Sequence, residues 1–147
     1  MNDIFQKGEK KMTKNDLEKV YYLKEELEMW KKRYKELVAD MSQDTVAADG
    51  LPHSVTNSIG RPTENKAILI ADHVELIREH MQKIELAIRE VEQFVATIDD
   101  PLTRQIVKLR CVDCMRWDEV AEQIGRTATG ESVRQMYHRF LKDIYFE

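Results

Sequence analysis

The sequence predicts an all-α protein in which a long antiparallel helical hairpin, coiled-coil-like, precedes a C-terminal helix-turn-helix domain of three helices. The composition favours helices, because 34% of the 147 residues are charged and only five are glycine and three proline. Two long segments repeat apolar residues at alternating spacings of three and four, the pattern of helices that wrap around one another. Three shorter amphipathic segments follow a proline at position 101.

The first long helix is expected to begin after a flexible N-terminal segment, residues 1–13. Its apolar positions are Val20, Leu23, Leu27, Trp30, Tyr34, Leu37 and Met41. The residues around this stripe are rich in lysine and glutamate, as the solvated flank of a helix should be. Packing against a second helix therefore explains Trp30 and Tyr34 better than the stacking of a ligand does.

The second long helix keeps the same alternation without a break. Its apolar positions are Ala67, Ile70, Val74, Ile77, Met81, Ile84, Ile88, Val91, Val95 and Ile98. Residues 42–64, between the two helices, are rich in small polar residues, glycine and proline, which indicates a long loop. Residues 14–98 thus predict a helical hairpin. The residues alone leave open whether the stripes pair within one chain or between copies of it.

The run Asp99-Asp100-Pro101 should end the second long helix, because proline disfavours helix in the residue before it and suits the first turn of a new one. Residues 99–147 then form the C-terminal domain, with helices expected at Leu102–Val112, Trp117–Ile124 and Glu131–Ile144. Their apolar faces are expected to close a small core. These faces are Leu102, Ile106 and Leu109; Trp117, Val120, Ala121 and Ile124; and Val133, Met136, Tyr137, Phe140, Leu141 and Ile144.

The last two of these helices have the spacing of a helix-turn-helix. Ala121 falls on the inner face of its helix, where a small side chain lets the next helix cross closely. Gly125 falls where the chain must turn, a position that often needs a positive φ. From Arg126 to Lys142 the chain carries four basic side chains and one acidic side chain, a net charge of +3, whereas the whole chain carries −4. Any pull on DNA is therefore local to this segment.

The outer face of the last helix has the side chains that read DNA. Arginine and glutamine can form paired hydrogen bonds with guanine and adenine, and lysine and arginine neutralise phosphates. Hydroxyls and free N–H groups at the helix start can hold a phosphate. The candidate DNA-binding residues are Arg126, Thr127, Thr129, Glu131, Ser132, Arg134, Gln135, His138, Arg139 and Lys142. The competing interpretation is a solvated charged face of a small helical bundle.

The residues Arg110, Trp117, Glu119, Ala121, Gly125, Val133, Arg134 and Gln135 resemble region 4 of bacterial sigma factors. The whole chain, including its Arg61-Pro62-Thr63-Glu64 element, resembles the small phage and prophage transcription regulators of the RinA/ArpU type. That resemblance implies a regulator of phage genes, with double-stranded DNA as its partner and RNA polymerase as a second expected partner. The turn after Gly125 is two residues longer than in sigma factors.

Other sites are not expected. Cys111 and Cys114 form a lone C-x-x-C pair with no second ligand pair, which favours buried or half-buried thiols at a helix end over a metal site. His73 and His80 are expected to be exposed flanking residues. No catalytic constellation is found, so we expect neither an enzyme nor a cofactor. No apolar run is long enough to span a membrane, and a cytoplasmic location is expected.

The leading hypothesis is a DNA-binding transcription regulator of phage type, whose heptad helices form a homo-oligomer or contact RNA polymerase. A second hypothesis is a DNA-packaging protein similar to small terminase subunits, which also couple a helix-turn-helix to helical oligomerisation. A third is a coiled-coil adaptor whose three-helix end binds another protein. Assembly into large rings would favour the second, and the absence of salt-sensitive DNA binding would favour the third.

Overall fold

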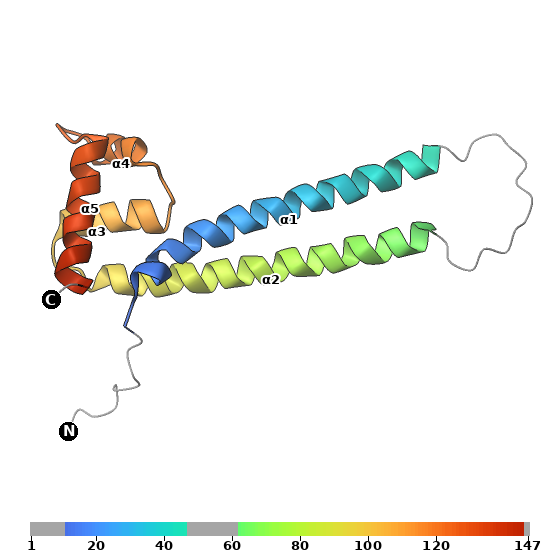
Figure 1. Cartoon of the computed structure of the whole chain (residues 1–147), viewed down its shortest axis with the longest axis horizontal. Coiled ribbons are helices and arrows are strands. Elements are labelled where there is room, and N and C mark those ends of the chain that lie inside the picture. The colour runs from blue at the N-terminus through green and yellow to red at the C-terminus, as the bar shows by residue number, and fades with distance from the viewer. Residues whose placement is uncertain (1–10, 47–61, 146–147) are drawn as a thin grey trace, which may run out of the picture. The chain divides into compact units, whose positions relative to one another are not determined.

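The computed structural model describes residues 11–46 and 62–145, and over these ranges the chain is all-α, as predicted. The helices are α1 (Lys14–Val46), α2 (Pro62–Ala96), α3 (Pro101–Cys111), α4 (Trp117–Ile124) and α5 (Gly130–Tyr145), as shown in Figure 1. The antiparallel pair of α1 and α2 and the three packed C-terminal helices confirm the predicted fold class. Both ends of the predicted loop 42–64 are helical, and residues 47–61 lie outside the described residues.

The chain divides into two compact units whose boundary differs from the predicted one. Residues 23–84 form the hairpin unit, and residues 1–22 and 85–147 form the C-terminal unit. The first two turns of α1 and the last three of α2 therefore belong with α3, α4 and α5. The physical reason lies in Leu17 and Val20, which are only 1% and 0% exposed. Two fully buried apolar side chains tie the start of α1 to this unit.

Within the hairpin unit, α1 packs through its predicted apolar stripe. Leu27 and Leu37 are buried. Trp30, Tyr34 and Met41 are half-buried on the same side of the helix. The spacing of three and four residues thus identified the buried face of α1 correctly, because those positions repeat close to the helical period.

The buried face of α2 differs from the predicted one in this unit. Val74 and Met81 are 48% and 49% exposed, whereas His80 is buried and His73 is half-buried. The prediction that both histidines are exposed was therefore wrong. A shift of one residue rotates the packing face of a helix by about 100°. Ile84 is compatible with both the predicted face and the observed one, so its burial does not distinguish between them.

The two histidines pack against Trp30 of α1. The ring centroids of Trp30 lie 5.8 Å from His73 and 6.3 Å from His80, both edge to face. Nε2 of His80 is 3.0 Å from Oε2 of Glu26. This interaction with His80 lowers the pKa of the Glu26 carboxyl. The carboxylate of Glu26 therefore gives the buried imidazole of His80 a polar partner, whereas His73 places its Nδ1 3.2 Å from the backbone carbonyl of Leu69.

The C-terminal unit has its own core. The buried side chains of its three short helices are Ile106, Val107 and Cys111 from α3, Val120 and Ala121 from α4, and Val133, Tyr137 and Leu141 from α5. The prediction that Leu102 and Met136 belong to this core was wrong, because their side chains are 37% and 38% exposed. Both side chains line the same open surface grooves instead of the core.

The start of α3 is fixed by an N-terminal cap, as the Asp99-Asp100-Pro101 run predicted. The carboxylate of Asp100 accepts hydrogen bonds from the backbone N of Thr103 at 3.0 Å and from its Oγ1 at 2.6 Å. Pro101 occupies the first helical position, where no N–H is needed. The hydrogen bond from the Thr103 side chain is the main cause of the lowered pKa of Asp100.

Candidate nucleic-acid interface

The joint between α4 and α5 has the features that the helix-turn-helix pattern requires. Ala121 is 6% exposed on the inner side of α4. Gly125 has φ of 75°, and its N–H donates to the carbonyl of Ala121 at 2.9 Å. Both positions confirm the prediction, because a φ in this range favours glycine at the end of a helix. Arg126 follows with φ of 59° and an exposed side chain.

A second glycine, which the sequence analysis did not single out, lies where the start of α5 meets α4. A Cβ atom at Gly130 would overlap with the carboxylate of Asp118 on α4. A side chain at 130 would therefore require the exposed carboxylate of Asp118 to move aside. The sequence shows that a glycine follows Thr129 where the last helix begins. It does not show that Asp118 of α4 lies next to this glycine.

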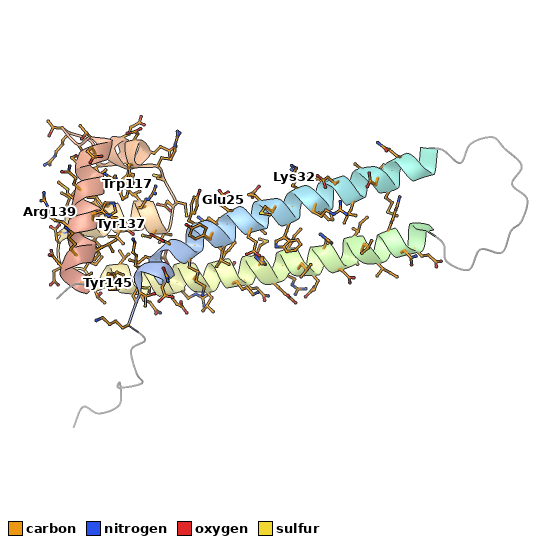
Figure 2. The ribbon with its side chains drawn as sticks, in the orientation of Figure 1. Glu25, Lys32, Trp117, Tyr137, Arg139 and Tyr145 are labelled. Atoms are coloured by element: carbon orange, nitrogen blue, oxygen red, sulfur yellow. The ribbon has the colours of Figure 1, made fainter. Side chains whose placement is uncertain are left out.

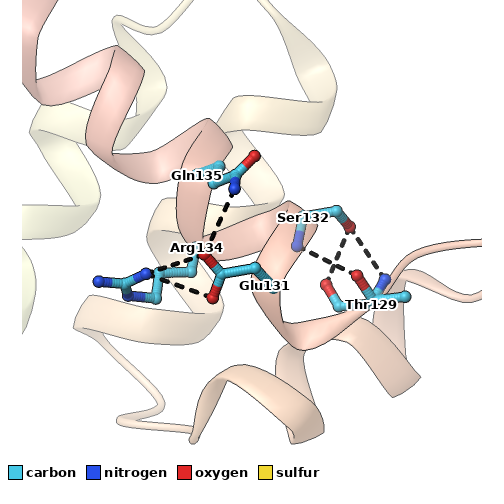
Figure 3. A network of polar contacts seen from close by, with 5 residues as sticks. All are labelled: Thr129, Glu131, Ser132, Arg134 and Gln135. Carbon is cyan, nitrogen blue, oxygen red and sulfur yellow. Dashed lines mark hydrogen bonds and ion pairs between the residues drawn. The ribbon is translucent and has the colours of Figure 1, made fainter.

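Thr129 and Ser132 cap α5 by bonding to each other (Figure 3). The backbone N of Ser132 donates to Oγ1 of Thr129 at 3.1 Å, and the backbone N of Thr129 donates to Oγ of Ser132 at 2.9 Å. Oγ of Ser132 also donates to the carbonyl of Thr129 at 2.9 Å. The structure brings the two predicted hydroxyls together, but as a reciprocal helix cap. A phosphate would have to compete with these bonds.

Glu131 holds the two side chains that are expected to read bases. Nη1 of Arg134 lies 3.0 Å and 3.2 Å from the two carboxylate oxygens of Glu131. Nε2 of Gln135 donates to Oε1 of the same carboxylate at 3.3 Å (Figure 3). In the free protein one acidic side chain therefore engages both predicted readers. All three residues are exposed, so these contacts are weak and exchange with water.

Helix α5 separates a buried face from a polar face. Val133, Tyr137 and Leu141 are 1%, 5% and 4% exposed. On the other side the predicted residues Glu131, Arg134, Gln135, His138, Arg139 and Lys142 are all exposed. The two remaining predicted residues of the turn, Arg126 and Thr127, are exposed as well. Arg139, labelled in Figure 2, and Lys142 have no ion-pair partner among residues 11–46 and 62–145, so their charges are available to a ligand.

A cluster of aromatic and cationic side chains packs against the buried side of α5, opposite its polar face. The guanidinium of Arg110 lies 4.5 Å above the ring of Trp117, and its Nη1 donates to the carbonyl of Met115 at 2.8 Å. The ring centroids of Trp117 and Tyr137 are 5.2 Å apart (Figure 2). These contacts connect the turn after α3 with the buried face of α5. They restrict how α5 can tilt.

The two cysteines are free thiols at the end of α3, as predicted. Sγ of Cys111 lies 3.6 Å from the hydroxyl of Tyr137. Burial raises the pKa of Cys111 to about 11, and burial likewise raises the pKa of Tyr137. Both groups are therefore neutral at neutral pH, and Cys111 is a poor nucleophile. The described residues contain no group of three or more histidine, cysteine or acidic side chains placed to hold a metal.

The chain matches no protein-family model, no curated protein and no solved structure. Among the described helices, none is long and apolar enough to cross a membrane.

Proposed function

We propose that this protein is a DNA-binding transcription regulator of phage type, which reads promoter DNA with the outer face of α5. The observation that carries the proposal is the division of α5 into a buried face and a basic, amide-bearing face, next to a helix joined to it by a turn that begins at Gly125. In helix-turn-helix proteins the second helix enters the major groove of DNA in this way. Arg134 and Gln135 are the proposed base readers.

The charge on this face supports phosphate contacts but not tight binding by one copy. The segment from Arg126 to Lys142 carries a net charge of +3 in a chain of net charge −4. Salt-dependent binding energy grows with the number of phosphates neutralised. A second copy on the same DNA would double that number, and paired half-sites are the usual solution for small helix-turn-helix domains.

The hairpin unit offers a surface for that second copy. Ala67, Val74 and Met81 of α2 are exposed and keep the predicted seven-residue spacing, one residue away from the face that packs on α1. Ile68 and Leu69 are also exposed nearby, at 59% and 47%. A helix that is apolar on more than one side is covered on more than one side. We propose dimerisation through this stripe. RNA polymerase is the further partner that the sigma-factor resemblance implies.

The test is selection of bound fragments from a random DNA pool, followed by binding measurements on the selected duplex. Replacement of Arg134 and Gln135 by alanine should abolish specific binding, with an expected loss of about 1–3 kcal/mol for each paired base contact. The control is Lys32→Ala, which removes an exposed charge from the hairpin unit (Figure 2). Circular dichroism checks that each variant keeps its helical content. Unchanged binding by the double variant would refute the assignment of α5 as the reader.

A further inference from the structure

The start of α1 lies against the end of α5 in the C-terminal unit. The hydroxyl of Tyr145 donates to the carbonyl of Met12 at 2.6 Å, a contact between residues 133 positions apart. Burial raises the pKa of Tyr145, so its hydroxyl keeps the proton that it donates. The N-terminal segment 1–13 was predicted to be flexible. Its residues 1–10 lie outside the described residues, but Met12 and Thr13 have defined partners.

The first turn of α1 is fixed by a capping box. The backbone N of Thr13 donates to Oδ2 of Asp16 at 3.0 Å, and the backbone N of Asp16 donates to Oγ1 of Thr13 at 3.2 Å. Leu17 is buried one residue later. Lys14 and Asn15, between the capping residues, therefore have fixed backbone positions while their side chains are exposed.

These two side chains and one edge of α5 line a common groove. It has a volume of about 570 Å³, and its lining includes Thr13, Lys14 and Asn15 from the start of α1 and Arg134, His138 and Lys142 from α5. Three of the lining residues are cationic at neutral pH. Lys14 and Lys142 have no ion-pair partner in the described part of the chain, whereas Arg134 pairs with Glu131. Asp16, the nearest acid on α1, is engaged in the cap.

The groove follows one edge of the reading face of α5. Arg134, His138 and Lys142 are spaced by four residues along the helix, so they form a row on one side of it. A helix in the major groove has a sugar-phosphate strand on each side, because the groove is only about 12 Å wide. His138 and Lys142, further along this edge than the base reader Arg134, lie beside the positive end of α1 and suit a phosphate strand rather than base edges.

We propose that the groove between the first turn of α1 and this edge of α5 binds the sugar-phosphate backbone of the DNA, with Lys14 and Asn15 as contacts from outside the helix-turn-helix. The inference rests on the function proposed above and extends its site to the opposite end of the sequence. Lys14 neutralises a phosphate, and the amide of Asn15 donates a hydrogen bond to a phosphate oxygen. Neither residue contributes to sequence discrimination.

The test compares Lys14→Gln with Lys19→Gln on the selected duplex and on a random-sequence duplex. Both lysines are exposed on the first turns of α1, but only Lys14 lines the groove. Loss of one phosphate contact should reduce the slope of log affinity against log salt by about 0.9, which is a difference of roughly 3.5-fold between about 50 and 200 mM salt. Lys14→Gln should show this change equally on both duplexes, Lys14→Arg should retain the wild-type slope, and Lys19→Gln should match the wild type.

Ethylation of single phosphates on the selected duplex gives an independent readout. At least one phosphate whose ethylation weakens wild-type binding should cease to matter in Lys14→Gln. If the alanine variant of Arg134 and Gln135 loses specific binding, the proposed function stands. If Lys14→Gln and Lys19→Gln then have equal salt slopes, the groove inference is overturned. A wild-type protein that binds no DNA at low salt would overturn both.

Discussion

Replacement of Glu131 by glutamine should strengthen binding to random-sequence DNA. In the free protein the carboxylate of Glu131 engages Arg134 at 3.0 Å and accepts from Gln135 at 3.3 Å. The side chains of Arg134 and Glu131 are 47% and 62% exposed, so solvent screens the pair. Arg134 must leave this carboxylate before it can contact DNA. The variant keeps the shape of the side chain but removes the charge that holds Arg134.

The expected size of the effect follows from the exposure of the pair. Exposed ion pairs contribute about 0.2–1 kcal/mol, so their release should tighten binding by about 1.4-fold to 5-fold. Loss of one negative charge near phosphate acts in the same direction. On the selected duplex the gain should be smaller if the Glu131 carboxylate accepts a hydrogen bond from a cytosine amino group, because that contact is then lost.

Fluorescence anisotropy with a labelled random-sequence duplex measures the affinity. Glu92→Gln is the matched control, because it removes one exposed acid from α2 in the same unit without a contact to α5 cations. The double variant Glu131→Gln with Arg134→Ala should lose most of the gain, since no arginine remains to be released. Affinity for Glu131→Gln equal to or below that of Glu92→Gln would refute the reasoning that Arg134 exchanges Glu131 for DNA.

Three further outcomes are expected. The contribution of Cys111 and Tyr137 to stability should be constant up to about pH 9 and fall towards pH 11, because burial raises the folded-state pKa of Cys111 from 9.0 to about 11 and also raises that of Tyr137. Thermal melts of Cys111→Ala should therefore show a weaker alkaline loss of stability than the wild type, and an unchanged pH profile would contradict this. Asp100→Ala should lower the melting temperature at pH 7. The difference from the wild type should shrink as the pH falls below the ordinary carboxyl pKa of 3.8, because the folded-state pKa of Asp100 is lowered and the stabilisation by its carboxylate disappears on protonation. An equal difference in strong acid would argue against a charge-dependent cap. Light scattering should give the mass of a dimer for the wild type and the mass of a monomer for the double variant Val74→Glu and Met81→Glu, whose exposed positions belong to the proposed dimer surface of α2. A wild type that remains a monomer at high concentration would exclude dimerisation through this surface.

The helices and their ends were largely predictable because their signals are local. Asp100 caps α3 through a residue three positions away, and Gly125 ends α4 with a positive φ that glycine adopts without a steric penalty. The buried and polar faces of α5 followed from a period of 3.6 residues. Each of these features depends on neighbours within about one helical turn.

The networks around the candidate site were less predictable, because two arrangements were compatible with the same local pattern. Thr129 and Ser132 could have left their hydroxyls for a phosphate or used them as a cap, and the structure has the cap. Glu131 was expected as a member of the reading face. Its simultaneous contact with Arg134 and Gln135 depends on side-chain positions that spacing alone does not specify.

The sequence by itself determined that this chain is helical, where its short helices begin and end, and which side of α5 carries the basic and amide side chains. Tertiary structure decided that α2 buries His80 and exposes Met81, and that the start of α1 joins the C-terminal unit through Tyr145 and Met12. Local preferences depend on residues within one turn, whereas a packing face is chosen by the partner that it meets. For α2 that partner is a tryptophan on α1, and for the start of α1 it is a tyrosine near the opposite end of the chain.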